Sequence, residues 1–212
     1  MFDEVVLGIE FFEGLTRIDA AIAGAVAAGG CLRCGCGRLH RSDYDRKPCG
    51  GTIGAAVETC RRRFSLCCDR RGCRRRATPP SVRFLGRRVY AGAVVLAACT
   101  VALALGAWSP KAVRRATGVP ARTVGRWLAW WRGPFTATAV FVALASRLVP
   151  AVATADLPAS LLARLAGDAK ACLGVALRQL APLTTTSVPD GSRFGRGVGD
   201  DPGPSGDPQK MA

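Results

Sequence analysis

Two pairs of closely spaced cysteines limit what residues 31–77 can fold into. This segment is rich in cysteine, glycine and arginine and poor in aliphatic side chains, so an apolar core alone cannot hold it together. A structural zinc ion can supply the missing stability, because its binding free energy becomes folding free energy in small domains. We therefore predict a zinc ribbon over residues 31–77, in which two hairpin tips present a tetrahedral four-sulfur site.

The spacing also indicates which cysteines are the ligands. The predicted set has two members from each half of the segment: Cys31, Cys34, Cys68 and Cys73. Gly35 permits the tight turn that points backbone amides at the first pair of sulfurs. Cys67 is an alternative to Cys68, because adjacent residues on a strand point to opposite faces and only one of them can face the metal. A cysteine-rich loop of free thiols is the alternative to a zinc site.

The N-terminal segment bears on the chemistry of these thiols. Residues 1–13 contain four acidic residues and no basic one, which is unlike the start of a secretory signal. In a cytoplasmic protein, clustered cysteines are more often metal ligands than disulfides. We assign no function to residues 1–30, which read as a short helix with a linker or as the product of a start codon placed too early.

The charge is concentrated in the middle of the chain. The protein has 30 basic and 15 acidic residues and a formal net charge of +15. Residues 31–132 hold 22 of the basic residues and only four of the acidic ones. Such a field favours a polyanionic partner, which can be DNA, RNA or an anionic membrane surface. A high-GC genome, which raises the arginine and alanine content of its proteins, could explain part of the excess of positive charge but not its concentration in one part of the chain.

Residues 82–133 carry the signals of a helix-turn-helix domain. Ser109 can cap a helix that has Pro110 in its first turn, and Gly118 can end this helix in the left-handed conformation. The next predicted helix has an apolar side made of Val124, Leu128 and Trp131. In a helix-turn-helix, the first residues of the second helix contact base edges in the major groove. A basic helical hairpin without DNA-binding function is the alternative.

The predicted DNA contacts follow from this arrangement. Sequence-specific contacts are expected from the free side of the second helix, and phosphate contacts from the first helix and from the arginine run after Cys73. The complete set is Arg74, Arg75, Arg76, Lys111, Arg114, Arg115, Arg122, Thr123 and Arg126.

Residues 91–108 offer a different interpretation. They form a run of eighteen uncharged residues, which is the threshold length for a membrane span. Seven of them are alanine, however, and basic residues flank both sides, so orientation in a membrane would be poorly specified. We expect a buried helix that supports the helix-turn-helix. A small membrane protein with a basic cytoplasmic zinc ribbon is the alternative function.

The remaining segments are assigned by pattern. Thr78-Pro79-Pro80-Ser81 marks a domain boundary, because neither proline can continue a helix. Residues 134–182 predict C-terminal helices, with an apolar stripe of core or partner-facing residues: Leu161, Leu162, Leu165, Ala169, Cys172, Leu173, Ala176, Leu177 and Leu180. Residues 183–212 are rich in Gly, Pro, Ser and Asp and predict a disordered tail.

Several of these motifs together resemble a bacterial family of short proteins that are associated with transposable elements and often labelled transposase. The resemblance rests on Cys31-x-x-Cys34, Gly37-Arg38-Leu39-His40, the stretch from Arg63 to Arg76 and the run from Thr78 to Tyr90. It implies a mainly α protein with a small β zinc ribbon before a helix-turn-helix, with structural Zn²⁺ and with DNA as partner. Leu32 and Cys36 depart from the family pattern, which has a proline and a glycine there.

Catalysis is not expected. Transposases of the common metal-dependent type need converging acidic residues, and the chain has no carboxylate between Asp69 and Asp156. No serine or tyrosine stands in a recognisable nucleophile setting. We therefore expect a nucleoid-associated bacterial protein of a mobile element that recognises DNA. Its further partner would be a separately encoded transposase or a second copy of itself, and a membrane partner is not expected.

Overall fold

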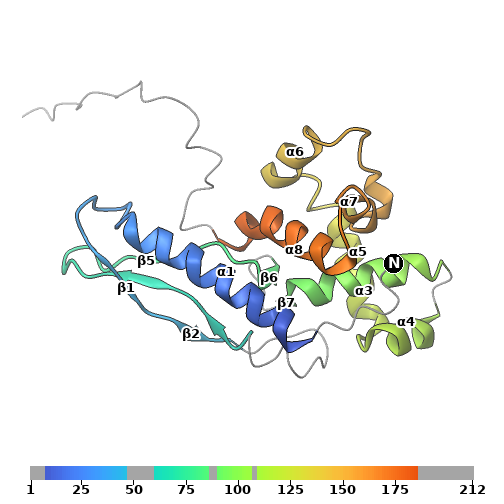
Figure 1. The fold of residues 1–212 in the computed structure, drawn as a ribbon, viewed down its shortest axis with the longest axis horizontal. Coiled ribbons are helices and arrows are strands. Elements are labelled where there is room, and N and C mark those ends of the chain that lie inside the picture. Colours follow the sequence, from blue (N-terminus) through green and yellow to red (C-terminus); the bar gives the residue numbers. More distant parts are fainter. Residues whose placement is uncertain (1–7, 47–59, 86–89, 107–108, 186–212) are drawn as a thin grey trace, which may run out of the picture.

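The computed structural model describes residues 8–46, 60–85, 90–106 and 109–185. Helices and small antiparallel sheets make up this part of the chain, so the protein is a mixed α/β structure with mostly helical elements (Figure 1). The helices are α1 (Ile9–Ala28), α3 (Gly92–Ala104), α4 (Pro110–Thr117), α5 (Ala121–Arg132), α6 (Ala139–Ala145), α7 (Ala159–Leu162) and α8 (Ala169–Leu180), with 3₁₀ turns η1 (Thr154–Asp156) and η2 (Ala181–Thr184). The strands are β1 (Leu39–Arg41), β2 (Tyr44–Asp45), β3 (Arg62–Arg63), β4 (Leu66–Cys68), β5 (Arg76–Ala77), β6 (Phe84–Leu85) and β7 (Tyr90–Ala91).

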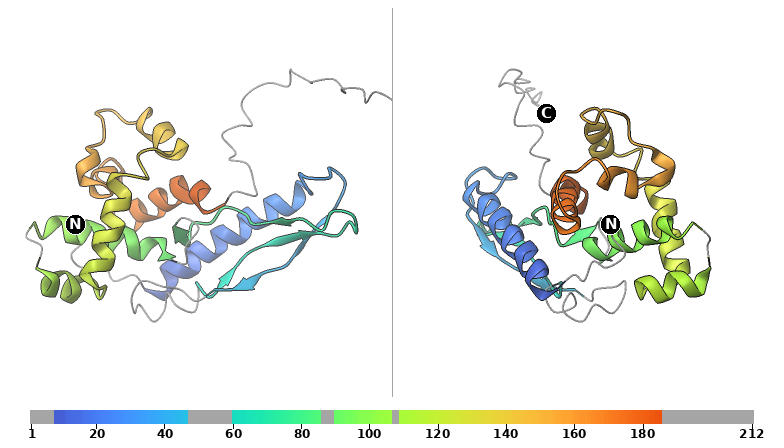
Figure 2. Two further views of the ribbon diagram at one scale, coloured as in Figure 1. Left: turned by 180° about the vertical axis from the view of Figure 1, so that it is seen from behind. Right: turned by 45° about the vertical axis from the view of Figure 1, so that its right-hand side comes forward.

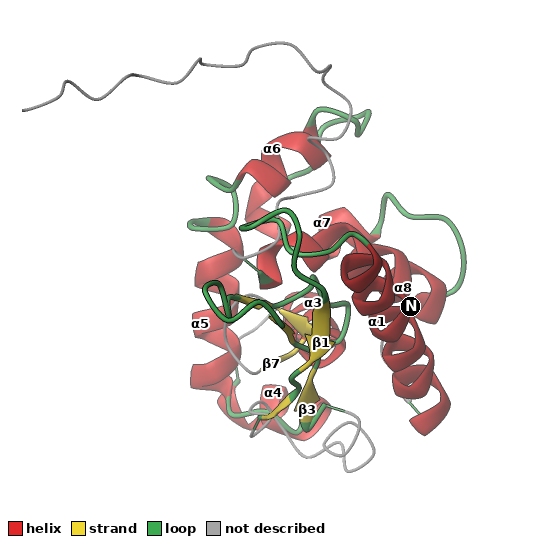
Figure 3. Cartoon of the chain, turned by 90° about the vertical axis from the view of Figure 1, so that its left-hand side faces the viewer, coloured by secondary structure: helices red, strands yellow, loops and turns green. Residues whose placement is uncertain are grey.

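The strands pair into three short antiparallel sheets. The largest has the order β1-β4-β5, the second pairs β2 with β3, and the third pairs β6 with β7. In the largest sheet Leu39 lies opposite Cys68, and Cys67 lies opposite Arg76. Figure 3 views the molecule from the end that carries these strands and shows how short they are beside the helices. The β4–β5 turn therefore brings the second cysteine pair to one end of the molecule.

Helix α1 is an integral part of the fold. One of its faces is buried, with Phe12, Leu15, Asp19 and Ala23 at helical spacing. The helix lies alongside the β1-containing sheet, while α3 to α7 form the other side of the molecule (Figure 2). The expected short helix and linker is thus one continuous helix that ends just before Cys31.

A buried ion pair fixes α1 to the segment after the two prolines. Arg83 Nε donates to Asp19 Oδ2 at 2.8 Å, and both side chains are almost fully buried. The Val82 amide donates to Asp19 Oδ1 at 2.7 Å, and the Ser81 hydroxyl donates to Oδ2. The predicted boundary at residues 78–81 is therefore packed into the protein rather than exposed as a linker.

A second buried arginine ties the same place to the C-terminal helices. Arg63 donates to the Pro79 carbonyl at 2.6 Å and lies 3.4 Å from the carbonyl oxygen of Thr184. The Thr184 hydroxyl accepts from the Ser81 amide at 2.9 Å. Burial lowers the pKa of Arg63 to about 10, although the charge of Asp19 opposes this shift. Because Thr184 is buried, the prediction that the disordered tail begins at residue 183 is wrong for 183–185, and residues 186–212 lie outside the described part.

Helix α3 lies at the centre of the helical part. Ten of its thirteen residues are buried, and it packs on α4, α5, α7 and α8. A helix that is apolar all round is expected in a core or in a membrane. Within the described ranges, no helix combines the length and the apolar character needed to cross a membrane. The first part of the run, residues 91–102, thus contributes most of its side chains to the interior of the protein, whereas Leu105 is exposed.

The C-terminal stripe divides between two helices. Its large apolar side chains in α7 and α8 are buried in the core: Leu161, Leu162, Cys172, Leu173, Leu177 and Leu180. Asp168 begins α8 by accepting a hydrogen bond from the Ala171 amide at 2.7 Å. Helix α6 buries none of its residues. The stripe of α7 and α8 therefore belongs to the core, with α3 as its neighbour.

Candidate functional site

The first cysteine pair lies in the turn between α1 and β1. We predicted a hairpin tip here, and this prediction is wrong because the preceding element is a helix. The turn is closed by the Gly35 amide, which donates to the Cys31 carbonyl at 2.8 Å, and Gly35 has a φ of +69°. The Cys31 amide donates to the Gly37 carbonyl at 3.0 Å. Glycine at position 35 thus adopts the left-handed conformation that the tight turn requires.

The second pair lies on the β4–β5 hairpin. Cys68 is the last residue of β4, and its amide donates to the Arg75 carbonyl at 2.9 Å. Cys73 lies in the turn, where its amide donates to the Arg70 carbonyl at 2.9 Å. This half of the site has the predicted hairpin geometry.

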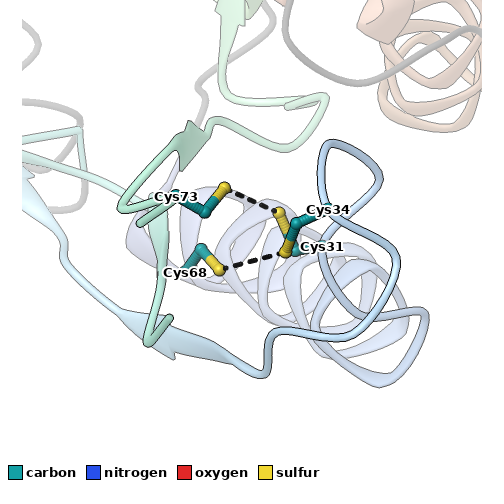
Figure 4. Close-up of side chains that lie close together, drawn as sticks. All are labelled: Cys31, Cys34, Cys68 and Cys73. Carbon is teal, nitrogen blue, oxygen red and sulfur yellow. Dashed lines mark hydrogen bonds between the residues drawn. The ribbon is translucent and has the colours of Figure 1, made fainter. Parts of the chain in front are cut away.

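The two turns bring four sulfur atoms together (Figure 4). Their Sγ atoms all lie within 4.8 Å of one another, and the Cys31–Cys73 and Cys34–Cys68 separations are both 3.7 Å. A tetrahedral zinc ion with Zn–S bonds of about 2.3 Å requires sulfur separations of about 3.8 Å. All four residues are free cysteines. The cluster can therefore hold one metal ion with two ligands from each turn.

Gly37 completes the site. A Cβ atom at this position would overlap Cys68 Sγ and would lie 3.1 Å from Cys34 Sγ. Any larger residue at position 37 would therefore push into the sulfur cluster. We did not single out Gly37 as a site residue, since its requirement arises from a sulfur that is distant in the chain.

The protein environment separates the acidities of two thiols in the cluster. The backbone amide of Cys36 donates to the Cys34 sulfur and, with help from the Gly37 amide and against partial burial, lowers the pKa of Cys34 to about 6. Burial raises the pKa of Cys68 to about 12, although the Arg70 amide opposes this shift. Cys34 is thus a thiolate at neutral pH, whereas Cys68 is a thiol that would release its proton to solvent when a metal ion binds.

The other polar side chains near the cluster lie outside it. Cys67 points away, with its Sγ 3.5 Å from the Arg74 carbonyl oxygen, so Cys68 is the member of this pair that reaches the cluster. Cys36 is exposed and accepts from Arg70 at 2.8 Å. His40 is exposed and lies 3.5 Å from Asp69.

The second candidate region is the helix pair α4–α5. Ser109 caps α4 by accepting from the Ala112 amide at 3.4 Å, and Pro110 occupies the first turn. Gly118 ends α4 with a φ of 68°, and its amide donates to the Arg114 carbonyl at 2.9 Å. The predicted start, end and turn of this helix are all present in the structure.

Helix α5 presents two different sides. Its inner side buries Val124, Trp127, Leu128 and Trp131. The ring of Trp127 packs edge-on against Tyr90, with ring centroids 5.2 Å apart. We did not predict Trp127 to be buried, because it adjoins Arg126 on the predicted free side of the helix.

The outer side of the helix pair is basic. Arg122 and Arg126 are exposed, and Arg126 lies 3.4 Å from the hydroxyl of the half-buried Thr123. The α4 cations predicted to contact DNA are also exposed: Lys111, Arg114 and Arg115. The remaining predicted contacts lie with the cysteine turns, where Arg74, Arg75 and Arg76 are exposed. The structure therefore divides the predicted DNA-contacting residues between two places.

Comparison with family models, curated proteins and solved structures found no match to this chain.

Proposed function

We propose that this protein binds DNA through the helix pair α4–α5 and uses the four-cysteine cluster as a structural zinc site. The observation that carries this proposal is the two-sided character of α5. Its inner side is anchored by buried tryptophan and aliphatic side chains, and its outer side exposes Arg122 and Arg126 near the start of the helix. A helix held in this way can offer its first turns to a DNA groove without losing its support.

The residue types on α5 suit base recognition. An arginine can donate two hydrogen bonds to O6 and N7 of guanine, and such a pair contributes about 1–3 kcal/mol of discrimination against the wrong base. Arg122 and Arg126 lie four residues apart, so they project from the same side of the helix. Lys111, Arg114 and Arg115 on the preceding helix would contact phosphates and fix the orientation of α5.

Zinc is the ion that best suits the cysteine cluster. Four thiolates at tetrahedral spacing favour zinc or an iron–sulfur centre over hard cations, which prefer oxygen. Sulfur separations of 3.7 Å match the edge of a tetrahedron around one ion. Four protein ligands leave no open coordination position, so the ion would stabilise the two turns and would not activate water.

We propose no catalytic step for this chain. Metal-dependent DNA strand cleavage requires carboxylates that converge on divalent cations. Residues 82–155, which include α3, α4, α5 and α6, contain no acidic residue. Together with the resemblance to transposon-associated proteins, this favours a DNA-recognition or accessory protein of a mobile element.

A binding assay with matched variants tests the proposal. We expect zinc-loaded protein to select one sequence from a random DNA pool and to bind it less tightly as salt increases. The double variant R122Q/R126Q should lose this selection. The control K170Q/R178Q removes two exposed cations from α8 and should bind like the wild type. Equal sequence selection by R122Q/R126Q and wild type would exclude α5 as the reading helix.

A further inference from the structure

We infer that one copy of this chain holds two DNA segments at once, one at the helix pair and one at the cysteine turns. The inference rests on the proposed function for the first segment. The second would lie on the turn surface, which we define as the exposed arginines of the two cysteine-bearing turns and their flanks: Arg33, Arg38, Arg70, Arg71, Arg74, Arg75 and Arg76. The helix surface is defined by the exposed cations Lys111, Arg114, Arg115, Arg122 and Arg126.

The turn surface has cations that are not neutralised by neighbouring acids. Asp69 accepts from the Arg38 amide at 3.0 Å and faces His40, while Asp43 pairs with Arg41 at 2.8 Å. Among the described residues, no guanidinium of the turn surface forms an ion pair with a carboxylate. Arg70 donates to Cys36 Sγ at 2.8 Å, and a zinc ion held by four thiolates would add a formal charge of −2 beneath this surface. Its seven arginines outweigh this charge and that of Asp69, so the net potential favours a polyanion.

The fold keeps the two surfaces apart. The β1–β4–β5 sheet with its turns and helix α4 lie at opposite ends of the long axis of the molecule (Figure 1). The start of α1 lies between these ends in the same view, and it exposes Glu10 and Glu13. A single duplex that ran from one end to the other and came near the start of α1 would meet these carboxylates, which repel phosphates. The charge pattern therefore favours two separate DNA segments over one continuous track.

A metal ion held by the cluster would make the turn surface rigid. Cys73 and Cys31 join the turn of Arg70 to Arg76 to the end of α1, with their sulfurs 3.7 Å apart. Within the turn, the Arg74 amide donates to the Arg70 carbonyl at 3.0 Å. Arginines on a fixed backbone lose less conformational entropy on binding than arginines on a flexible loop. Arginine–phosphate contacts carry no sequence information. The turn surface would therefore hold its DNA segment without sequence preference, whereas the helix surface would recognise a sequence.

Duplex DNA is the occupant that we propose, rather than an anionic membrane. Insertion into a membrane interface needs a broad apolar face beside the basic residues. Leu32 is the only large hydrophobic side chain that the described part of the two cysteine turns exposes. The turn surface is thus basic and polar, as expected for phosphate contacts alone.

A bridging experiment tests this inference with the full zinc-loaded chain. A duplex carrying the selected sequence is immobilised, protein is added, and capture of a labelled random-sequence duplex is measured. The variant R38Q/R71Q/R75Q removes three of the seven positive charges of the turn surface, at side chains that make no hydrogen bond, ion pair or ring contact in the described structure. It should bind the immobilised duplex but capture little of the second one. The control R147Q/K170Q/R178Q loses the same charge from exposed sites elsewhere and should bridge like the wild type.

The two sets of variants distinguish bridging of two DNA segments from sequence recognition by α5. R122Q/R126Q should lose sequence selection yet still bind random duplex. When R38Q/R71Q/R75Q is added to this variant, the slope of log affinity against log salt concentration should become smaller by about 0.9 for each phosphate contact that is removed. Full bridging by R38Q/R71Q/R75Q would overturn the inference, as would bridging only by a dimer detected by light scattering. Binding of anionic vesicles by the turn surface, with no capture of random duplex, would also overturn the inference in favour of a membrane. If R122Q/R126Q keeps its selection, the proposed function fails instead.

Discussion

Asp19 and Arg83 form a buried ion pair, with Arg83 Nε 2.8 Å from Asp19 Oδ2 and both side chains at most 2% exposed. The pair joins the N-terminal helix to the bend just before strand β6. Arg83 also lies over the ring of Phe64, with Cζ 4.5 Å from the centroid. The contact thus links three parts of the chain that we first assigned to different domains.

Replacing Asp19 should destabilise the whole protein. Asp19→Ala leaves the buried guanidinium of Arg83 without its carboxylate, and breaking such a pair costs about 3–5 kcal/mol. Chemical denaturation of zinc-loaded protein should show this loss. The control Glu13→Ala removes an exposed carboxylate of the same helix and should change the unfolding free energy by about 0.5 kcal/mol or less. Similar stability for the two variants would show that the ion pair does not join α1 to the core.

The cysteines should differ in their effect on metal content. Serine at position 31, 34, 68 or 73 removes one of four thiolates, and each single variant should hold less zinc than the wild type. Cys67→Ser and Cys36→Ser should keep one zinc per chain, because these sulfurs lie outside the cluster. Metal analysis of the purified proteins measures this difference. Loss of zinc from Cys67→Ser with retention in Cys68→Ser would reverse our ligand assignment.

Two glycines near the cluster give a matched pair. Gly37→Ala places a Cβ against Cys68 Sγ and should weaken zinc binding in competition with a chelator. Gly72→Ala should bind zinc as the wild type does, since a Cβ there has no atom within 4 Å. Equal zinc affinity for the two variants would contradict the close approach of Gly37 to the sulfurs.

Zinc affinity should depend on pH with a change of slope. The pKa of Cys68 is raised to about 12, so zinc must displace its proton throughout the neutral range, and affinity falls as pH decreases. The pKa of Cys34 is lowered to about 6, so its proton is displaced only below this pH. The slope of log affinity against pH equals the number of protons displaced by zinc, so it should increase by about one below pH 6. Chelator competition across this pH measures the slopes, and a constant slope would argue against a thiolate at Cys34.

The end of α4 should require glycine. Gly118 has a φ of 68°, and an alanine in the left-handed conformation costs about 1 kcal/mol or more. Gly24→Ala lies inside α1 with open space around the new Cβ, and should instead stabilise the protein by about 0.5–1 kcal/mol. Thermal unfolding should shift in opposite directions for the two variants. A stabilising Gly118→Ala would contradict the left-handed end of the helix.

Local signals predicted much of what lies within single elements. The cap at Ser109, the end at Gly118 and the apolar side of α5 each depend on residues a few positions apart, and all three are present. The predicted buried helix after residue 91 is present as α3 for the same reason. The roles in DNA and metal binding remain predictions, because shape alone does not reveal a ligand.

The sequence by itself determined the cysteine spacing, the segregation of positive charge and the limits of α4, because each is a property of neighbouring residues. Only the tertiary structure decided that Cys68 rather than Cys67 joins the cluster, that Gly37 must lack a side chain and that α1 belongs to the fold. These features depend on contacts between distant residues, such as Asp19 with Arg83 or Arg63 with Thr184, which are 64 and 121 positions apart. Forming such contacts requires closing long loops, which costs conformational entropy. The packing of the whole chain offsets this cost, and a short stretch of sequence carries no information about that packing.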